Sequence, residues 1–533
     1  MHVLCFNPYV RWTLHGARQA AILHGLHMRD TQITMVLCDG LMPECDLYQP
    51  AKGDKAKRTG KSCNRCQAES SYLTAKNNLA YLWLGRWLEP GVIAKAYAFS
   101  NAISDPVTAE YNDWPIGAWV KSSVHSHYRR ETLDLEDADT ETTYRRYVAG
   151  GIVIASAFDA LLTHEKPDAQ LLFNGRMAPT RIALELAKQH GVRTITEERG
   201  FTPGHLRLVE NTHCLDPKPF YALSAAWQYT PLTLDERSAL ENLLDKHFAG
   251  SDYEMSLFAA PVQETEGIKR QLGIQDNVKR AVLFTSSTDE PSGQPEAVGS
   301  FDHQRDWVQE TIAEFSHKPD WTLIVRTHPN SGGKRSVGDN VSELDFIESL
   351  QENCPNNVVI VKPEDEISSY DLIKTAHCGL IWHSSLGIEI AATGRPVFRA
   401  GNYWFRDARF MTQQTPDVSY SDSLSQFLWD AASGKAFEAT MEATVAAWRF
   451  AYCWFFRQSI HFPLVRQPTW ATGEAAYNSL EALQPGKDQS LDRVCDIILD
   501  HAPVHIEPHA RSSAGEAEER AHINAFVQRF AKA

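Results

Sequence analysis

Residues 321–329 read Trp-Thr-Leu-Ile-Val-Arg-Thr-His-Pro. The apolar run at 321–325 is rich in β-branched residues, and polar and turn-forming residues follow it, which is typical of a buried strand. Such a strand delivers Arg326 and His328 at its carboxyl end. Ligands of open α/β sheets bind at the carboxyl ends of the strands. The stretch therefore predicts a sheet edge that carries a binding site.

A second stretch, residues 379–389, reads Gly-Leu-Ile-Trp-His-Ser-Ser-Leu-Gly-Ile-Glu. It predicts a strand at 379–382 and a helix at 386–393, with Ser384 and Ser385 at the junction. The serine hydroxyls and the first backbone N–H groups of the helix favour an anion such as a phosphate. Glu389, about one turn into the helix, is placed to accept hydrogen bonds from sugar or ribose hydroxyls.

Similar elements recur along the chain. A strand is predicted at 358–361, and Ser368 with Asp371 three residues later predicts the start of a helix. In the first half of the chain, predicted strands at 33–37, 170–173 and 192–196 precede Asp39, Asn174 and Glu198. The alternation of strands and helices in both halves predicts an α/β protein.

The length of 533 residues is too great for a single core. We expect two doubly wound, Rossmann-like domains that face each other across a cleft. The predicted divisions are an N-terminal, acceptor-side domain at 1–255 with a cysteine-containing insertion near 38–66, a C-terminal donor domain at 280–445, and a helical tail at 446–533 that packs back on the first domain.

The combination of motifs resembles the carboxyl half of the bacterial capsule polysaccharide biosynthesis family, which includes Kdo transferases that use a CMP-activated sugar. The matching residues are Arg326, His328, Pro329, Ser368, Ser384, Ser385, Glu389, Gly394 and Pro396. More distantly, the chain is similar to bacterial sialyltransferases with a His-Pro motif and to teichoic-acid polymerases that use CDP-glycerol. In the capsule family, loops similar to Asn174-Gly175-Arg176 and Glu198-Arg199-Gly200 belong to the acceptor-side domain.

The resemblance implies a GT-B glycosyltransferase of bacterial surface polysaccharide or glycoconjugate assembly. Kdo or a related acidic sugar on a CMP donor is the expected substrate, and a glycan or glycolipid is the expected acceptor. The donor-binding residues are then Arg326, His328, Ser368, Ser384, Ser385 and Glu389, and the acceptor-side residues are Asn174 and Arg176. His328 would stabilise the charge that develops on the leaving nucleotide, so catalysis needs no metal cofactor. Arg326 has a second interpretation, in which it braces its loop.

A carboxylate must also activate the acceptor, and the sequence offers two candidates. Asp39 and Gly40 resemble the acidic-Gly motif of the His-Pro sialyltransferases, although Asp-Gly is also a common turn. Glu198 is the other candidate, although it could instead form an ion pair with Arg199. Inversion and retention of the anomeric centre both stay open.

Three alternative functions remain beside a CMP-sugar transferase. A CDP-glycerol-type polyol phosphate transferase shares the His-Pro and Ser-Ser motifs, but Trp382-His383 stands where Thr-Asp-Tyr is expected before the serines. A transferase that uses UDP or GDP sugars is the second alternative. A catalytically silent, glycan-binding module is the third.

The net charge of −15 argues against a protein that coats nucleic acid. The basic residues at 52–61 are interpreted as a solvated loop. The start of the chain lacks the pattern of a signal peptide, and the apolar runs at 150–162 and 450–456 are short for a membrane span. We expect a cytoplasmic protein, which a lipid-linked acceptor would bring to the inner membrane surface.

Four of the ten cysteines cluster in the sequence: Cys38, Cys45, Cys63 and Cys66. A Cys-x-x-Cys turn can hold two corners of a tetrahedral zinc ion, and the other pair could supply the remaining ligands. The spacings are not those of a standard zinc finger. A structural zinc site and four reduced thiols are both compatible with the pattern, whereas a disulfide framework is not expected in a cytosolic chain.

Overall fold

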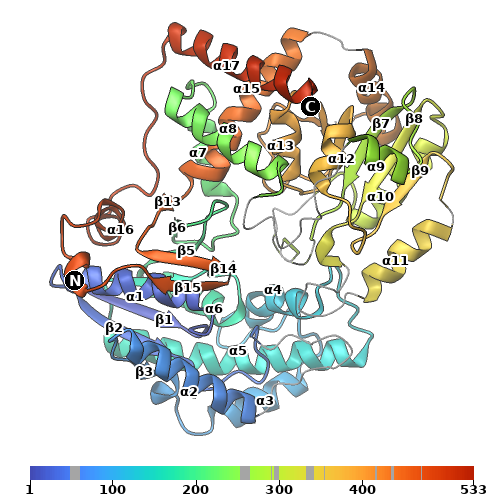
Figure 1. Ribbon diagram of the computed structural model, residues 1–533. Coiled ribbons are helices and arrows are strands. Elements are labelled where there is room, and N and C mark those ends of the chain that lie inside the picture. The colour runs from blue at the N-terminus through green and yellow to red at the C-terminus, as the bar shows by residue number, and fades with distance from the viewer. Residues whose placement is uncertain are drawn as a thin grey trace. The chain divides into compact units, whose positions relative to one another are not determined.

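The computed structural model describes residues 1–47, 60–251, 265–287, 289, 291–292, 294, 299–331, 341–352, 354–414, 417–433, 437–469 and 471–532. The chain divides into two compact units (Figure 1). Unit 1 comprises residues 1–216 and 456–506, and unit 2 comprises residues 217–455 and 507–533. The chain therefore passes from one unit to the other at three points.

Unit 1 is built on a seven-stranded sheet with the strand order β13-β6-β5-β4-β1-β2-β3. Its strands are β1 (His2–Asn7), β2 (Gln32–Leu37), β3 (Leu82–Trp83), β4 (Ala169–Phe173), β5 (Arg193–Arg199), β6 (His205–Glu210) and β13 (Ile460–His461). Strands β1 to β5 run parallel, and β6 is antiparallel to β5. Because β2 and β4 flank β1 on opposite sides, the winding reverses at β1, and the crevice between the ends of β1 and β4 is the expected ligand site.

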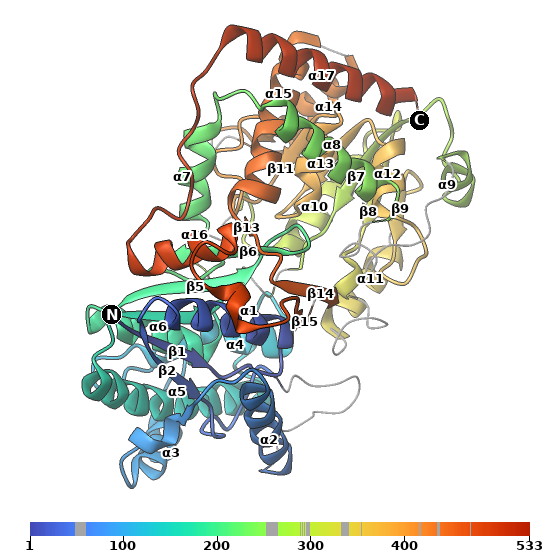
Figure 2. The same cartoon turned by 60° about the vertical axis from the view of Figure 1, so that its left-hand side comes forward.

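Helices cover both faces of this sheet (Figures 1 and 2). The helices of unit 1 are α1 (Thr13–His27), α2 (Gly60–Lys76), α3 (Val92–Ala102), α4 (Ile116–Tyr128), α5 (Ala138–Glu165), α6 (Ala178–Gln189) and α16 (Gln489–Leu499). Apolar side chains of α4, α5 and α6 form one core with Leu4 and Phe6 of β1. Those of α1 and α16 form a second core with Val3 and Cys5. A short hairpin, β14 (Val465–Thr469) and β15 (Thr472–Ala475), also lies against α1.

Helix α5 is, within the described part of the chain, the one helix long and apolar enough to cross a membrane. It has 28 residues, and 72% of its most apolar window is buried inside the protein. Its inward side chains, such as Ile152 and Phe158, belong to the core of unit 1. Packing in that core accounts for the apolar composition of the helix.

Unit 2 is built on a six-stranded parallel sheet with the order β12-β11-β10-β7-β8-β9. Its strands are β7 (Lys279–Phe284), β8 (Trp321–Arg326), β9 (Val358–Val361), β10 (Cys378–Ile381), β11 (Val397–Arg399) and β12 (Thr412–Gln413). Its helices are α7 (Lys218–Trp227), α8 (Leu234–Phe248), α9 (Thr265–Gln271), α10 (Gln304–Ser316), α11 (Val341–Glu352), α12 (Ser369–Thr375), α13 (Leu386–Ala392), α14 (Tyr420–Ser433), α15 (Phe437–Tyr452) and α17 (Ser513–Lys532). The winding reverses at β7, between β8 and β10.

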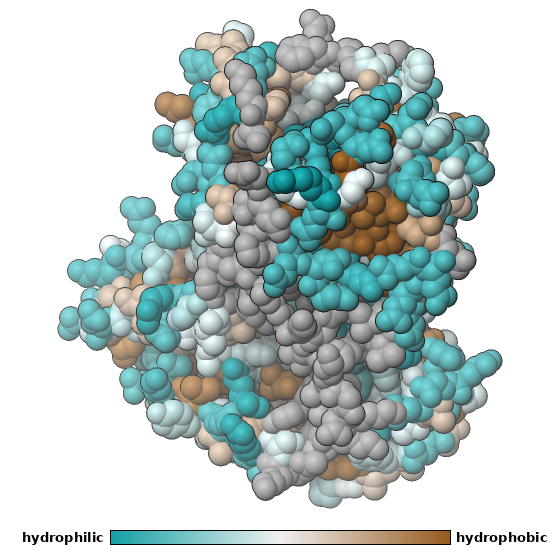
Figure 3. Space-filling view, turned by 45° about the vertical axis from the view of Figure 1, so that its right-hand side comes forward, coloured by the Kyte–Doolittle hydropathy of each residue, from teal (hydrophilic) through white to brown (hydrophobic). Residues whose placement is uncertain are grey.

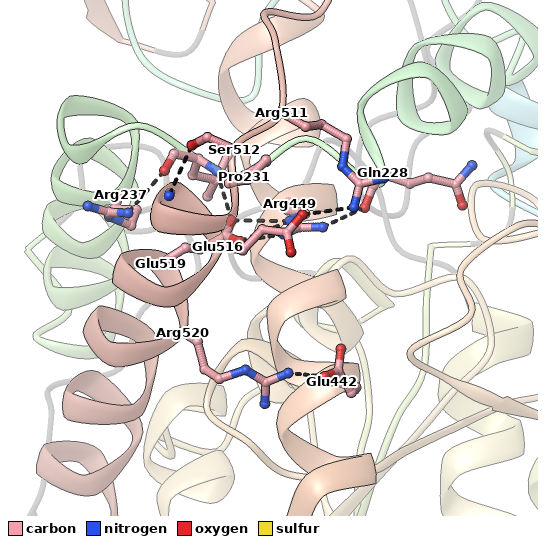
Figure 4. Close-up of polar contacts among 12 residues, drawn as sticks. Gln228, Pro231, Arg237, Glu442, Arg449, Arg511, Ser512, Glu516, Glu519 and Arg520 are labelled. Atoms are coloured by element: carbon pink, nitrogen blue, oxygen red, sulfur yellow. Dashed lines mark hydrogen bonds and ion pairs between the residues drawn. The ribbon is translucent and has the colours of Figure 1, made fainter.

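The last helix, α17, is fixed to unit 2 by a buried ion pair (Figure 4). The Glu519 side chain is fully buried, and the Arg449 guanidinium on α15 donates to it through Nε at 3.1 Å and Nη2 at 2.5 Å. Glu519 also accepts from the backbone N–H of Leu232, at 2.8 Å. One carboxylate thus links three segments of unit 2: α17, α15 and the loop before α8.

The predicted fold class, two doubly wound α/β units, is confirmed. The division of the chain differs from the predicted boundaries, because α7 and α8 belong to unit 2, where α8 packs against α12, α15 and α17. The predicted tail is shared: residues 456–506 belong to unit 1 and the rest to unit 2.

On the face shown in Figure 3, hydrophilic side chains predominate around one larger hydrophobic patch.

Candidate functional site

The loops that follow β7, β8 and β10 are tied together at the carboxyl edge of the unit 2 sheet. The Thr285 hydroxyl, just after β7, accepts a hydrogen bond from the backbone N–H of His328 at 2.8 Å. The Ser286 hydroxyl accepts from the backbone N–H of His383 at 3.0 Å. The two hydroxyls therefore hold the His-Pro loop and the His-Ser-Ser loop on either side of β7, where the winding reverses.

The backbone of Ser286 is itself fixed by α10. Its N–H donates to the Gln304 side-chain oxygen at 2.7 Å, and its carbonyl accepts from the Gln304 amide at 3.1 Å. Both residues are buried. The centre of the edge is thus rigid before any ligand arrives, as a site that works by preorganised donors requires.

His328 lies on this edge and is half-buried. Burial, the largest cause, and the nearby Arg326 charge together lower the pKa of its imidazole to about 4, against the opposing effect of Asp289. The ring is therefore neutral at pH 7 and carries one N–H that can donate to a phosphate.

Ser384 is half-buried and Ser385 is exposed, and both directly precede α13 on the same edge. Preceding them, His383 packs against Trp382 and Tyr403, with ring centroids 5.3 and 5.9 Å away. Burial lowers the pKa of His383 to about 3. The contact of both serine hydroxyls with a donor phosphate stays a prediction.

The remaining predicted donor residues lie deeper. Arg326 is 3% exposed, and its guanidinium donates to the backbone carbonyl of Lys362, which braces the loop after β9. The Ser368 hydroxyl accepts from the N–H of Tyr370 at 3.2 Å and caps α12. These contacts give both side chains structural partners, and their direct contact with a donor stays a prediction.

Glu389 is also buried, with 3% of its surface exposed. Its carboxylate lies 3.4 Å from Nδ1 of His247 on α8, and both side chains are about 95% buried. Glu389 thus faces α8 in this structure, and its predicted contact with ribose hydroxyls stays a prediction.

In unit 1, a cluster of polar side chains lies at the carboxyl ends of β1, β4 and β5. The Glu198 carboxylate accepts from the Asn174 amide at 2.6 Å and lies 3.5 Å from Nε2 of His15. The other ring nitrogen of His15, Nδ1, lies 3.1 Å from the fully buried Glu197. Burial acts to raise the pKa of Glu198, but His15, Arg199 and the Asn174 hydrogen bond hold it below its usual value. Glu198 is therefore ionised at neutral pH.

Arg176 is 3% exposed, and its backbone N–H donates to the side-chain oxygen of Asn174 at 2.9 Å, whereas its guanidinium bonds to α4. Its Nη1 donates to the hydroxyls of Ser122 and Ser126 on α4, at 2.8 Å each. These bonds tie the loop after β4 to α4. They give Arg176 a structural role in unit 1, and its acceptor-side role stays a prediction.

Asp39, the other candidate carboxylate, follows β2. Its two oxygens each accept from the backbone N–H of Gly85 at 3.2 Å. Burial raises the pKa of the Asp39 carboxyl above its usual value, against the opposing effect of its backbone hydrogen bonds. A raised pKa suits a general base. The choice between Asp39 and Glu198 as the catalytic carboxylate stays open.

The four clustered cysteines line one pocket of unit 1, together with Pro8, Tyr9, Gly40, Met42, Glu44, Asp46, Gln67 and Pro179. Cys63 and Cys66 are not on a turn, as the sequence suggested, because α2 begins at Gly60 and places them one helical turn apart. Among the described residues, no three His, Cys, Asp or Glu side chains converge on a point that could hold a metal ion. Burial raises the pKa of Cys38 to about 11 and also raises those of Cys45 and Cys66. A structural zinc site and four reduced thiols at this pocket both stay predictions.

Sequence reasoning did not foresee the side chains that organise each edge. It placed the loop at 285–287, which follows a predicted strand, near the nucleotide base, but gave no role to the hydroxyls of Thr285 and Ser286. His15 and its neighbour Trp12 follow the first strand in the same way. They were overlooked because they lie past the turn, within and just before α1.

No family model matches the chain, and no curated protein matches it significantly. Among solved structures, the UDP-GlcNAc 2-epimerase from Neisseria meningitidis is similar with 13% identity, 85% of this chain and 96% of that chain covered, and a TM-score of 0.28. The β-Kdo 2,4 transferase KpsC of Thermosulfurimonas dismutans is similar with 11% identity, 60% and 88% covered, and a TM-score of 0.34. The β-Kdo 2,7 transferase of the same protein is similar with 11% identity, 62% of this chain and 90% of that chain covered, and a TM-score of 0.33. At these scores the likenesses assign neither a family nor an activity to the chain.

Proposed function

We propose that this protein is a glycosyltransferase that binds a nucleotide-sugar donor at the carboxyl edge of the unit 2 sheet. The observation that carries the proposal is the pair of hydroxyls on Thr285 and Ser286, which hold the His328 and His383 loops on the two sides of β7. This is the position at which doubly wound sheets bind nucleotides. The order of the His-Pro and Ser-Ser motifs along the chain supports a donor phosphate as the ligand.

The proposed chemistry breaks the bond between the anomeric carbon of the sugar and the phosphate oxygen, and forms a bond from that carbon to an acceptor hydroxyl. Negative charge develops on the leaving phosphate. The neutral N–H of His328 and the hydroxyls of Ser384 and Ser385 stabilise that charge by hydrogen bonding. The proton of the acceptor hydroxyl passes to a carboxylate, for which Asp39 and Glu198 are the candidates.

The sugar that we propose is Kdo or a related acidic sugar, delivered from a CMP donor to a glycan or glycolipid acceptor. The support is the resemblance of residues 326–329 and 383–389 to the capsule polysaccharide family. A cytoplasmic enzyme would meet both substrates, at the inner membrane surface if the acceptor is lipid-linked.

The test is calorimetric titration of the full-length protein with CMP, CDP, UDP and GDP. Binding of CMP in preference to the others, weakened at least about tenfold in His328→Ala, is the expected result. The matched control is His317→Ala, which removes an exposed histidine of the same unit.

Other nucleotide preferences would point to other donors. A preference for UDP or GDP keeps the donor site and replaces the CMP sugar, whereas a preference for CDP favours the polyol phosphate transferase. The absence of binding to any of the four nucleotides would overturn the donor site.

A further inference from the structure

An aromatic group lies at the point of unit 1 where the winding of the sheet reverses. The Trp12 ring stacks on Tyr9, with centroids 4.8 Å apart, and meets the edge of Phe173 at 5.3 Å. Tyr9 and Trp12 follow β1, and Phe173 ends β4. These are the two strands between which a doubly wound sheet binds its ligand.

His15 joins this aromatic group to the carboxylates. It lies three residues after Trp12, on the same side of the start of α1, and its ring centroid is 4.0 Å from that of Phe173. Its Nε2 faces Glu198 at 3.5 Å. Trp12, Phe173, His15 and Glu198 therefore form one continuous group that draws on three elements of unit 1.

Two members of the group are accessible, whereas their supports are buried. Trp12 is half-buried, and 17% of the Glu198 side chain is exposed. Tyr9, Phe173 and Glu197 are each at most 3% exposed. An indole and a carboxylate, linked through Phe173 and His15, thus both reach solvent from a buried base.

The chemistry of the exposed pair fits a sugar. An indole ring offers a flat apolar surface for the C–H face of a pyranose. Glu198, which is ionised and already oriented by Asn174 and His15, accepts hydrogen bonds from hydroxyl groups. A negative charge at the site disfavours an acidic sugar, so the expected class is a neutral sugar.

We propose that Trp12 and Glu198 form a binding site for a neutral sugar, with the ring stacked on Trp12 and a hydroxyl hydrogen-bonded to Glu198. The inference deepens the proposed function, since the sugar would be the acceptor of the transfer. It stands on unit 1 alone, so it can hold or fail independently of the donor site.

The experiment is saturation-transfer difference NMR on the full-length protein with glucose, galactose, N-acetylglucosamine and, as the acidic sugar, Kdo. We expect a signal from at least one neutral sugar that falls about tenfold in Trp12→Ala and in Glu198→Gln. Trp12→Phe, which keeps an aromatic ring, should retain part of the signal. Trp429→Ala, which removes a 65% exposed indole in unit 2, is the matched control and should change nothing.

The remaining outcomes overturn the proposal. The proposal fails if no neutral sugar gives a saturation-transfer signal. It also fails if the signal is unchanged in Trp12→Ala and Glu198→Gln. Thermal melting of each variant separates lost binding from lost folding, and the conservative Trp12→Phe and Glu198→Gln variants keep the test valid if Trp12→Ala does not fold. Nucleotide titration of the same variants should be normal, so a failed donor site would be seen separately.

Discussion

The backbone N–H of Gly85 donates to both carboxylate oxygens of Asp39, at 3.2 Å each. A Cβ at position 85 would lie 2.4 Å from Oδ2 of Asp39, so a larger residue there must displace this carboxylate. The close approach fixes the carboxylate at the end of β2 and leaves it partly exposed.

Gly85→Ala should therefore displace Asp39 and destabilise unit 1. The expected cost is roughly 1–3 kcal/mol, the usual range for overpacking a close contact. Urea unfolding of the variant measures it. In an Asp39→Ala background the same substitution should cost much less, and an equal cost in both backgrounds would show that the clash is not with Asp39.

Glu519→Gln should be strongly destabilising, because it leaves the Arg449 guanidinium in a buried position without its counter-charge. Losing one partner of a buried ion pair costs about 3–5 kcal/mol. The control is Arg520→Ala on the same helix, which breaks the exposed ion pair with Glu442 (Figure 4) and should cost about 0–1 kcal/mol. Similar unfolding midpoints for the two variants would contradict the importance of the buried pair.

Acid should destabilise unit 1 through His213. Burial, the largest cause, and the positive charges of Arg181, Arg176, Lys188 and Arg207 together lower the pKa of this imidazole to about 2. The folded protein therefore keeps the ring neutral, while the unfolded chain protonates it below pH ~6.5. The stability from this group is complete above pH ~6.5 and falls by about 1.4 kcal/mol per pH unit as the pH drops towards 2.

His213→Gln removes the titrating group, so its unfolding free energy should depend less steeply on pH between about 6.5 and 4. Denaturant titrations of both proteins across that range provide the measurement. Parallel pH curves for wild type and variant would rule out His213 as a source of the acid sensitivity.

Thr285→Val should weaken nucleotide binding about tenfold, because the hydroxyl that accepts from the His328 N–H is lost while the shape of the side chain is kept. Thr285→Ser retains the hydroxyl and should bind almost as the wild type does. Calorimetry with the nucleotide that the wild-type protein prefers compares the three proteins. Equal affinities would place the ligand away from the β7 loop.

The strands were the most predictable part of the fold, because each is an apolar run that ends in turn-forming residues. The strand predicted at 358–361 coincides with β9, and the one at 321–325 differs from β8 only by Arg326. Because the strands run parallel, their carboxyl ends lie at one edge of the sheet. His328 and Ser385 lie on this edge. Sequence reasoning therefore located this edge of the sheet without any knowledge of contacts, and its role in binding a donor stays a prediction.

Contacts between distant residues could not be predicted. Asp39 and Gly85 are 46 residues apart, and Glu389 turns towards His247 of α8 although its spacing from Ser385 suggested the ligand side. Cys63 and Cys66 were placed on a turn by their motif, but α2 continues through them. Such details depend on which helix covers which face, and local periodicity does not contain that information.

Unit 1 is completed only by residues 456–506, which follow most of unit 2 in the chain. Helix α1 is buried from Leu14 to Leu26 because it lies between the sheet and the segment that carries β15 and α16. During synthesis on a ribosome, one side of α1 would stay uncovered until almost the whole of unit 2 had been made. The unit that is made first is thus finished late, and a chaperone that shields α1 in the interval would raise the yield of folded protein.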